Sequence, residues 1–239
     1  MLMGEGCTRM GYNTMFYEIT PEQAVGYMDW HLRALKRKGI EIRSILDIGA
    51  AHGHFSRFAL TVWPGAEITA IECNPLDAHY LDRTNWDVHY TCLGDKPCTR
   101  VFYTNPNDPV GGGSSLYREN TSAFDAPVET EVQIQTLDSL DLGSFDLIKM
   151  DTQGSELDII KGGRNTIEKA RYLLMELSFM PYNEGGCLID DVLAETRAMG
   201  FRMIDTFGPT HGGHVWNDEK IQVDVLFAKE SEPIFAFHG

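Results

Sequence analysis

The sequence has few basic residues for its length. Only 20 lysines and arginines stand against 35 acidic residues, which gives a formal net charge of −15 at pH 7. Such a charge repels polyanions at long range. The one dense basic cluster, Lys36-Arg37-Lys38, closes a predicted helix. We therefore expect neither a nucleic acid nor an anionic membrane surface as a partner.

The sequence also lacks a recognisable cysteine framework. Its five cysteines form no C-x-x-C pair, and their odd number argues against a set of disulfides (Cys7, Cys73, Cys92, Cys98 and Cys187). The first residues have neither the basic start nor the apolar run of a signal peptide, and no apolar segment is long enough to span a bilayer. We expect reduced, mostly buried thiols and a cytoplasmic protein. No acid or histidine spacing is typical of a metal site, so we predict no metal.

What is present suits one large α/β domain. The 239 residues include 43% hydrophobic residues, which is enough for a full core, and no linker or repeat divides them. A capping box at Thr20-Pro-Glu-Gln23 predicts a helix that ends near Gly39. We expect residues 1–39 to pack on a core domain of residues 40–239.

The stretch from Ser44 to Ser56 organises the core domain. It reads Ser-Ile-Leu-Asp-Ile-Gly-Ala-Ala-His-Gly-His-Phe-Ser, an apolar strand followed by a glycine-containing turn and the start of a helix. A second strand ends in Glu72, where a carboxylate can accept hydrogen bonds from both hydroxyls of a ribose. The unit is therefore βαβ, and we expect a ribose-containing ligand.

The turn decides which nucleotide is favoured. A dinucleotide fold uses G-x-G-x-x-G, whereas the turn here has Gly49 and Gly53 without the middle glycine. Asp47 places a negative charge beside the turn, which repels phosphate and suits the sulfonium of S-adenosylmethionine. The D-x-G-x-x-x-G pattern resembles motif I of the class I methyltransferases; simple packing of a strand on a turn is the alternative.

The rest of the chain predicts a Rossmann-like, doubly wound sheet of seven strands. Further strands are expected over residues 88–93, 145–150, 171–179, 201–207 and 221–229. The link between the last two is too short for a helical crossover, so we expect the last strand to be antiparallel. Residues 100–104 and 128–136 predict an inserted β-hairpin. The intervening stretch 105–127 is either a mobile surface loop or a lid over the cofactor.

Four blocks in order give a narrower resemblance. They are Leu46-Asp-Ile-Gly-Ala50 with Gly53, Thr136-Leu-Asp-Ser-Leu140, Ile148-Lys-Met-Asp-Thr-Gln-Gly-Ser-Glu156 and Val223-Asp-Val-Leu-Phe227. Over residues 40–229 the chain resembles the FkbM-type methyltransferases. The resemblance implies S-adenosylmethionine as methyl donor and a hydroxyl acceptor on a sugar or other secondary metabolite. Two departures are Ala51, where the family commonly has Asn, and Gln153, where it commonly has Glu.

The expected cofactor contacts follow the ends of these strands. They comprise Asp47, Gly49, Ala50, Gly53, Phe55, Ser56, Glu72, Cys73, Asn74, Leu93 and Asp151. The region around Leu93 is where this architecture usually places the adenine edge.

Three residues are candidates for the catalytic base that methyl transfer to an alcohol requires. Asp151 is the first choice because it ends a central strand, although an acid there can also cap a turn. Glu156 is a candidate whose position in a first helical turn equally suits the helix dipole. His214 follows the sixth strand in a loop and titrates near neutrality. Glu176 is either a site acid or a charge paired within the sheet.

Two other functions stay open at this stage. A nicotinamide-dependent oxidoreductase shares the βαβ unit, although the missing glycine argues against it. The departures at Ala51 and Gln153 leave room for a catalytically silent protein that binds S-adenosylmethionine.

Overall fold

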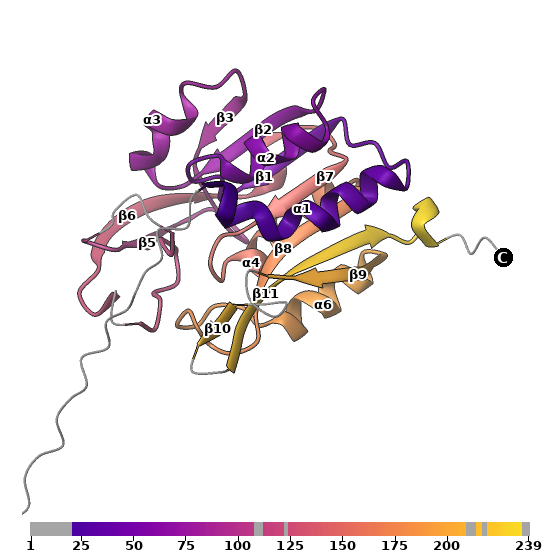
Figure 1. The fold of residues 1–239 in the computed structure, drawn as a ribbon. Coiled ribbons are helices and arrows are strands. Elements are labelled where there is room, and N and C mark those ends of the chain that lie inside the picture. Colours follow the sequence, from indigo (N-terminus) through magenta and orange to yellow (C-terminus); the bar gives the residue numbers. More distant parts are fainter. Residues whose placement is uncertain (1–20, 108–111, 122–123, 209–213, 217–218, 236–239) are drawn as a thin grey trace, which may run out of the picture.

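The structure is a computed structural model, and it describes residues 21–107, 112–121, 124–208, 214–216 and 219–235. A central sheet carries helices on both faces (Figure 1). Its strands are β1 (Ser44–Ile48), β2 (Glu67–Glu72), β3 (Asp87–Tyr90), β7 (Leu147–Met150), β8 (Tyr172–Ser178), β9 (Phe201–Phe207), β10 (His214–Trp216) and β11 (Glu219–Lys229). The helices are α1 (Pro21–Arg37), α2 (His54–Val62), α3 (Ala78–Leu81), α4 (Glu156–Gly162), α5 (Arg164–Ile167) and α6 (Ile189–Ala198), with short 3₁₀ turns at Pro75–Asp77, Leu137–Leu140 and Pro233–Phe235.

The strand order confirms the predicted Rossmann-like class. The sheet runs β10-β11-β8-β7-β1-β2-β3, and β9 pairs with β11 on the edge opposite β8. The β1 strand is parallel to β2 and β7, whereas β11 is antiparallel to β8 and β9. The antiparallel last strand was therefore predicted correctly, and β10 is an addition that the sequence did not indicate.

Alternation along the buried strands explains the two cores. On β1, Leu46 and Ile48 face a core formed with α4, α5 and α6. Ile45, which precedes Leu46 and has the opposite phase, faces α1 and α2. Successive side chains of a strand point to opposite faces, so the apolar residues of β1 pack into both cores. Asp47 has the phase of Ile45 and is fully buried.

A second sheet of three strands stands beside the carboxyl ends of the main strands. The predicted hairpin is confirmed as β5 (Cys98–Thr104) paired antiparallel with β6 (Val128–Gln135). β4 (Cys92–Leu93) adds to it, parallel to β6. The single strand predicted over residues 88–93 is therefore wrong. Its first part pairs with β2, and the chain then leaves the main sheet to pair with β6.

Two further helical segments accompany the first strands of the sheet. After β2, the 3₁₀ turn Pro75–Asp77 leads directly into the single turn α3. Thr20 of the predicted capping box lies outside the described residues, and the helix itself is α1. Within the described ranges, none of the helices is long and apolar enough to cross a bilayer.

Candidate functional site

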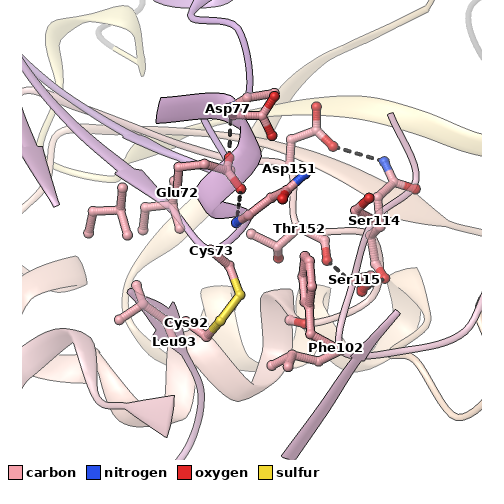
Figure 2. A pocket seen from close by; sticks show the side chains of 18 of the residues that line it. Glu72, Cys73, Asp77, Cys92, Leu93, Phe102, Ser114, Ser115, Asp151 and Thr152 are labelled. Atoms are coloured by element: carbon pink, nitrogen blue, oxygen red, sulfur yellow. Dashed lines mark hydrogen bonds between the residues drawn. A yellow bond between two sulfur atoms is a disulfide. The ribbon is translucent and has the colours of Figure 1, made fainter. Parts of the chain in front are cut away.

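A pocket opens at the carboxyl ends of β1, β2 and β7, where ligands bind in open α/β sheets. The small sheet contributes Cys92, Leu93 and Phe102, and residues 112–116 close another side. Figure 2 shows Glu72, Asp77 and Asp151 toward one end of the pocket, and Leu93 and Phe102 toward the other. The pocket thus joins an acidic end to an apolar end.

The turn after β1 forms the floor of this pocket. Gly49 has a φ of +75°, and a Cβ there would lie 2.0 Å from the backbone oxygen of Asp151. Only glycine permits the ends of β1 and β7 to approach so closely. Ala51 has a φ of +44°, and its amide donates to Glu72 Oε2 at 2.7 Å. This hydrogen bond therefore fixes the turn after β1 relative to the Glu72 carboxylate at the end of β2.

Glu72 is placed as the sequence predicts for a ribose-binding acid. Its side chain lines the pocket, and Oε1 accepts a second hydrogen bond from the Asn74 amide at 2.7 Å. Burial raises the pKa of Glu72 to about 7, while the hydrogen bonds from Asn74 and Ala51 oppose the rise. Each carboxylate oxygen has two lone pairs, so both oxygens can still accept a hydroxyl group.

Asp47 lies outside the pocket lining. Its Oδ2 accepts from Ser56 Oγ at 2.6 Å, and Oδ1 lies 3.5 Å from Lys149 Nζ. Burial raises the pKa of Asp47, against the lowering effect of Lys149. The sequence reasoning assigned its charge to a sulfonium ligand. The structure pairs that charge with a lysine of the neighbouring strand instead.

Lys149 is a buried charged residue behind the site that the sequence analysis did not single out. Its Nζ also lies 3.3 Å from Asp151 Oδ2 and donates to the Gly49 carbonyl at 3.1 Å. Burial lowers the pKa of Lys149, but Asp151 and Asp47 raise it further, so the net direction is upward. A charged residue inside the apolar run Leu-Ile-Lys-Met was the available signal, because a buried lysine requires a partner.

The cysteines contradict the prediction of free thiols. Cys73 follows Glu72, and it forms a disulfide with Cys92 across the pocket wall, with Cα atoms 4.5 Å apart (Figure 2). An odd number of cysteines is compatible with one disulfide, since Cys98 and Cys187 are free and Cys7 lies outside the described residues. The pairing joins two strand ends that only the folded sheets bring together.

The described part of the 105–127 stretch supports the lid alternative. Residues 112–116 line the pocket. Ser115 Oγ donates to the Thr152 and Gln153 carbonyls at 3.0 and 2.8 Å, and its amide donates to the Tyr103 carbonyl. The segment is thereby fastened both to the small sheet and to the turn after β7. Residues 108–111 and 122–123 lie outside the described structure.

Asp151 lies on the pocket wall with a side chain that is 36% exposed. Its Oδ1 accepts from Gln153 Nε2 at 2.9 Å, and its Oδ2 faces Lys149. The carboxylate is thus reachable from the pocket and held from two sides.

The other candidate bases are placed differently. Glu156 is 1% exposed and outside the pocket lining, and it accepts hydrogen bonds from the Thr152 and Gly154 amides. These contacts favour the structural alternative. Glu176 accepts from Gln153 Nε2, one strand further along the sheet. His214 begins β10, but its side chain lies outside the described structure.

The remaining expected cofactor contacts divide into two groups. Gly49, Cys73, Asn74 and Leu93 line the pocket. Ala50, Gly53, Phe55 and Ser56 do not, and Ala50, Phe55 and Ser56 are buried behind the turn. Gly53 has a φ of +73° and caps α2, so its role there is conformational. Among the described residues, no group of three or more His, Cys, Asp or Glu side chains could hold a metal ion.

Comparisons with known proteins show what the chain is similar to. The sequence pattern of the family described as "Methyltransferase FkbM domain" matches residues 47–203. The 2-O-methyltransferase NoeI of Sinorhizobium fredii is 29% identical over 163 residues, which cover 59% of this chain and 65% of that protein. The match therefore spans less than two thirds of the relative's length.

Solved structures share the fold. An S-adenosylmethionine-dependent methyltransferase from Clostridium acetobutylicum superimposes with a TM-score of 0.54 at 7% identity, covering 89% of this chain and 93% of that one. Methyltransferase FkbM from Methylobacillus flagellatus gives a TM-score of 0.48 at 18% identity, covering 86% and 50% respectively. The matched pattern includes the turn after β1, the acid at the end of β2 and the block that ends β7. This chain belongs to the FkbM methyltransferase family.

Proposed function

We propose that the protein is an S-adenosylmethionine-dependent O-methyltransferase that acts on a hydroxyl of a sugar or other secondary metabolite. The observation that carries this proposal is the pocket itself, which joins Glu72 at the end of β2 to Asp151 at the end of β7. Membership of the FkbM family and the likeness to a 2-O-methyltransferase support the reaction type.

The residues present fit the proposed donor. Glu72 would accept hydrogen bonds from the ribose hydroxyls, since it lines the pocket and each of its oxygens has a lone pair that the Ala51 and Asn74 amides do not use. Leu93 and Phe102 offer apolar surface for the adenine. Gly49 leaves the floor without a side chain, so a ligand can lie against the backbone. When bound, S-adenosylmethionine supplies an electrophilic methyl group on a positively charged sulfur.

Asp151 would serve as the base toward the acceptor. As the acceptor oxygen attacks, its proton would pass to a carboxylate oxygen of Asp151, which is reachable from the pocket. Lys149 and Gln153 hold this carboxylate in place, which limits the reorganisation that the transfer requires. Residues 112–116 would shield the reacting groups from water. Alignment of the two reactants supplies the larger share of catalysis, about 7–11 kcal/mol, and a positioned base adds about a hundred- to ten-thousandfold.

Thermal melts with S-adenosylmethionine, S-adenosylhomocysteine, NAD or no ligand test the cofactor. A ligand at one hundred times its dissociation constant stabilises by about 2.7 kcal/mol. We expect both S-adenosyl compounds to raise the melting temperature and NAD to leave it unchanged. Stabilisation by NAD alone would favour the oxidoreductase alternative and overturn the proposal.

Substitution of Asp151 tests the base. We expect Asp151→Asn to lose about a hundred- to ten-thousandfold in turnover with binding of S-adenosylhomocysteine intact. Asp125→Asn, an exposed acid outside the pocket, is the matched control. A screen of sugars with labelled donor must first supply an acceptor. A protein that binds the donor but methylates nothing in a broad screen would match the silent alternative.

The proposed setting is cytoplasmic, with a small-molecule or carbohydrate acceptor as partner and no metal. Disulfides are rare in the cytoplasm, so the Cys73–Cys92 pair offers a direct test. Thiol trapping in freshly lysed cells reports whether these cysteines are oxidised there. Full oxidation would contradict a cytoplasmic setting.

A further inference from the structure

Gln153 occupies an unusual backbone position in the turn after β7. Its φ is +54°, a left-handed conformation that residues other than glycine rarely adopt. The turn is held from both sides. The Glu156 carboxylate accepts from the Thr152 and Gly154 amides, and Ser115 Oγ donates to the Gln153 carbonyl. These contacts fix the backbone at position 153 and therefore the direction in which the Gln153 side chain leaves it.

The side-chain amide of Gln153 joins three strands. Its Nε2 donates to Asp151 Oδ1 at 2.9 Å and to Glu176 Oε2 on β8. Its Oε1 accepts from Gln222 Nε2 on β11 at 3.2 Å. An amide has two N–H donors, and an ionised carboxylate only accepts. The neutral amide of Gln153 thus donates a hydrogen bond to each of two carboxylates.

A carboxylate at the same position would have the opposite effect. It would face Asp151 and Glu176 without a proton to donate, and neighbouring like charges disfavour ionisation. Other titratable groups lie near these two carboxylates. Lys149 on β7, Asp47 on β1, Glu156 on α4 and Tyr27 on α1 interact with Asp151, and Asp224 on β11 lies opposite Glu176. Of these, Lys149 carries a positive charge and also faces Asp47. A negative charge added at position 153 would therefore have only Lys149, among the groups named here, as a source of opposite charge.

We propose that Gln153 is a positioning residue, whose amide bridges Asp151 and Glu176 and thereby holds the Asp151 carboxylate toward the methyl acceptor. The positioning role rests on the proposed function, in which Asp151 is the base. The bridge itself does not depend on that function. It can therefore be tested without an acceptor.

The first experiment measures stability against pH. Gln153→Glu is compared with Gln133→Glu, the same chemical change on the exposed face of β6. If position 153 faces two carboxylates, one of the three acids retains a proton in the folded protein well above the unfolded glutamate pKa of about 4.3. The folded state then binds more protons than the unfolded state, so stability falls as pH rises from 5 to 8. Each unit of raised pKa lowers the melting temperature by about 3 °C.

The outcomes of this experiment are distinct. A melting temperature of Gln153→Glu that falls with pH relative to Gln133→Glu supports the bridge. Parallel curves for the two variants would overturn it, because the new carboxylate would then be as well solvated as an exposed one.

The second experiment measures turnover. Gln153→Gly removes the amide and suits the left-handed backbone, so the variant is expected to fold. We expect kcat to fall about ten- to a hundredfold with an unchanged KM for the donor, since misplacing a reacting group costs up to about a hundredfold. Full turnover in Gln153→Gly beside an inactive Asp151→Asn would overturn the positioning role alone. Full turnover in Asp151→Asn would overturn the base assignment and, with it, the positioning role.

Discussion

Two turns of this protein are each held by a buried glutamate, and only one of these glutamates lines the pocket. After β1, the Glu72 carboxylate accepts from the amide of left-handed Ala51. After β7, the Glu156 carboxylate accepts from the amides on either side of left-handed Gln153. Glu72 lines the pocket, whereas Glu156 does not.

A buried glutamate at such a turn can be either a ligand-binding acid or a structural one. Burial raises the pKa of both carboxylates, and backbone amides oppose the rise in both. The direction of the pKa shift does not tell them apart. What distinguishes Glu72 is access from the pocket. We therefore expect loss of Glu156 to affect stability and loss of Glu72 to affect binding.

The largest effect is expected for Glu156→Ala. It leaves the buried amide of Gly154 and the partly buried amide of Thr152 without this acceptor, at about 1–3 kcal/mol each, so the free energy of unfolding should fall by about 4 kcal/mol. Urea denaturation measures this loss, with Glu129→Ala on exposed β6 as control. A loss below about 1 kcal/mol would remove the structural role of Glu156.

Opening the disulfide is expected to cost somewhat less. Cys73 and Cys92 are separated by 19 residues, and closing a loop of that length stabilises a protein by about 3 kcal/mol. Cys92→Ser, or a dithiol reductant, should lower the free energy of unfolding by that amount. Cys98→Ser changes a free cysteine and serves as the control. Unaltered stability under reductant would mean that the two thiols are not paired.

Glu72→Gln should act on the ligand. A hydrogen bond to a charged group contributes about 1.5–3 kcal/mol, so we expect S-adenosylhomocysteine to bind about ten- to a hundredfold more weakly. Calorimetric titration measures the change. Glu67→Gln alters an exposed acid of the same strand and should leave the affinity as it is. Equal affinities for the two variants would contradict a ribose contact at Glu72.

The smallest effect is a pH dependence with opposite signs for binding and stability. Because Glu72 has a pKa of about 7 in the folded protein, its binding-competent carboxylate is scarce at pH 6. Binding should weaken about tenfold between pH 8 and pH 6. The folded protein also takes up the proton that the unfolded chain binds only near pH 4.3, so Glu72 makes the unliganded protein more stable as pH falls through 7, by about 1 kcal/mol per pH unit. Glu72→Gln should abolish both trends, and titrations at the two pH values check this.

The sequence was sufficient for features that are local along the chain. The apolar run before Gly49 and the acid at Glu72 predicted the βαβ unit and the side of the sheet that bears the pocket. Asp151 was found in the same way, because it directly follows a buried strand. Short-range patterns determine these features, so no knowledge of distant contacts was needed.

Features that join distant segments could not be predicted. The Cys73–Cys92 pair depends on a chain that leaves one sheet for another within a few residues. The ion pairs of Lys149 link neighbouring strands whose order is fixed only in the fold. The Gln153 bridge likewise requires β8 and β11 to lie beside β7. In each case the residue type was visible, but its partner was not.

A crystal structure of the protein with S-adenosylhomocysteine would show whether Glu72 binds the ribose of the donor. We expect the ribose hydroxyls within hydrogen-bonding distance of the Glu72 carboxylate and the adenine against Leu93 and Phe102. Solvent alone beside Glu72, with the ligand bound elsewhere or not at all, would contradict this expectation.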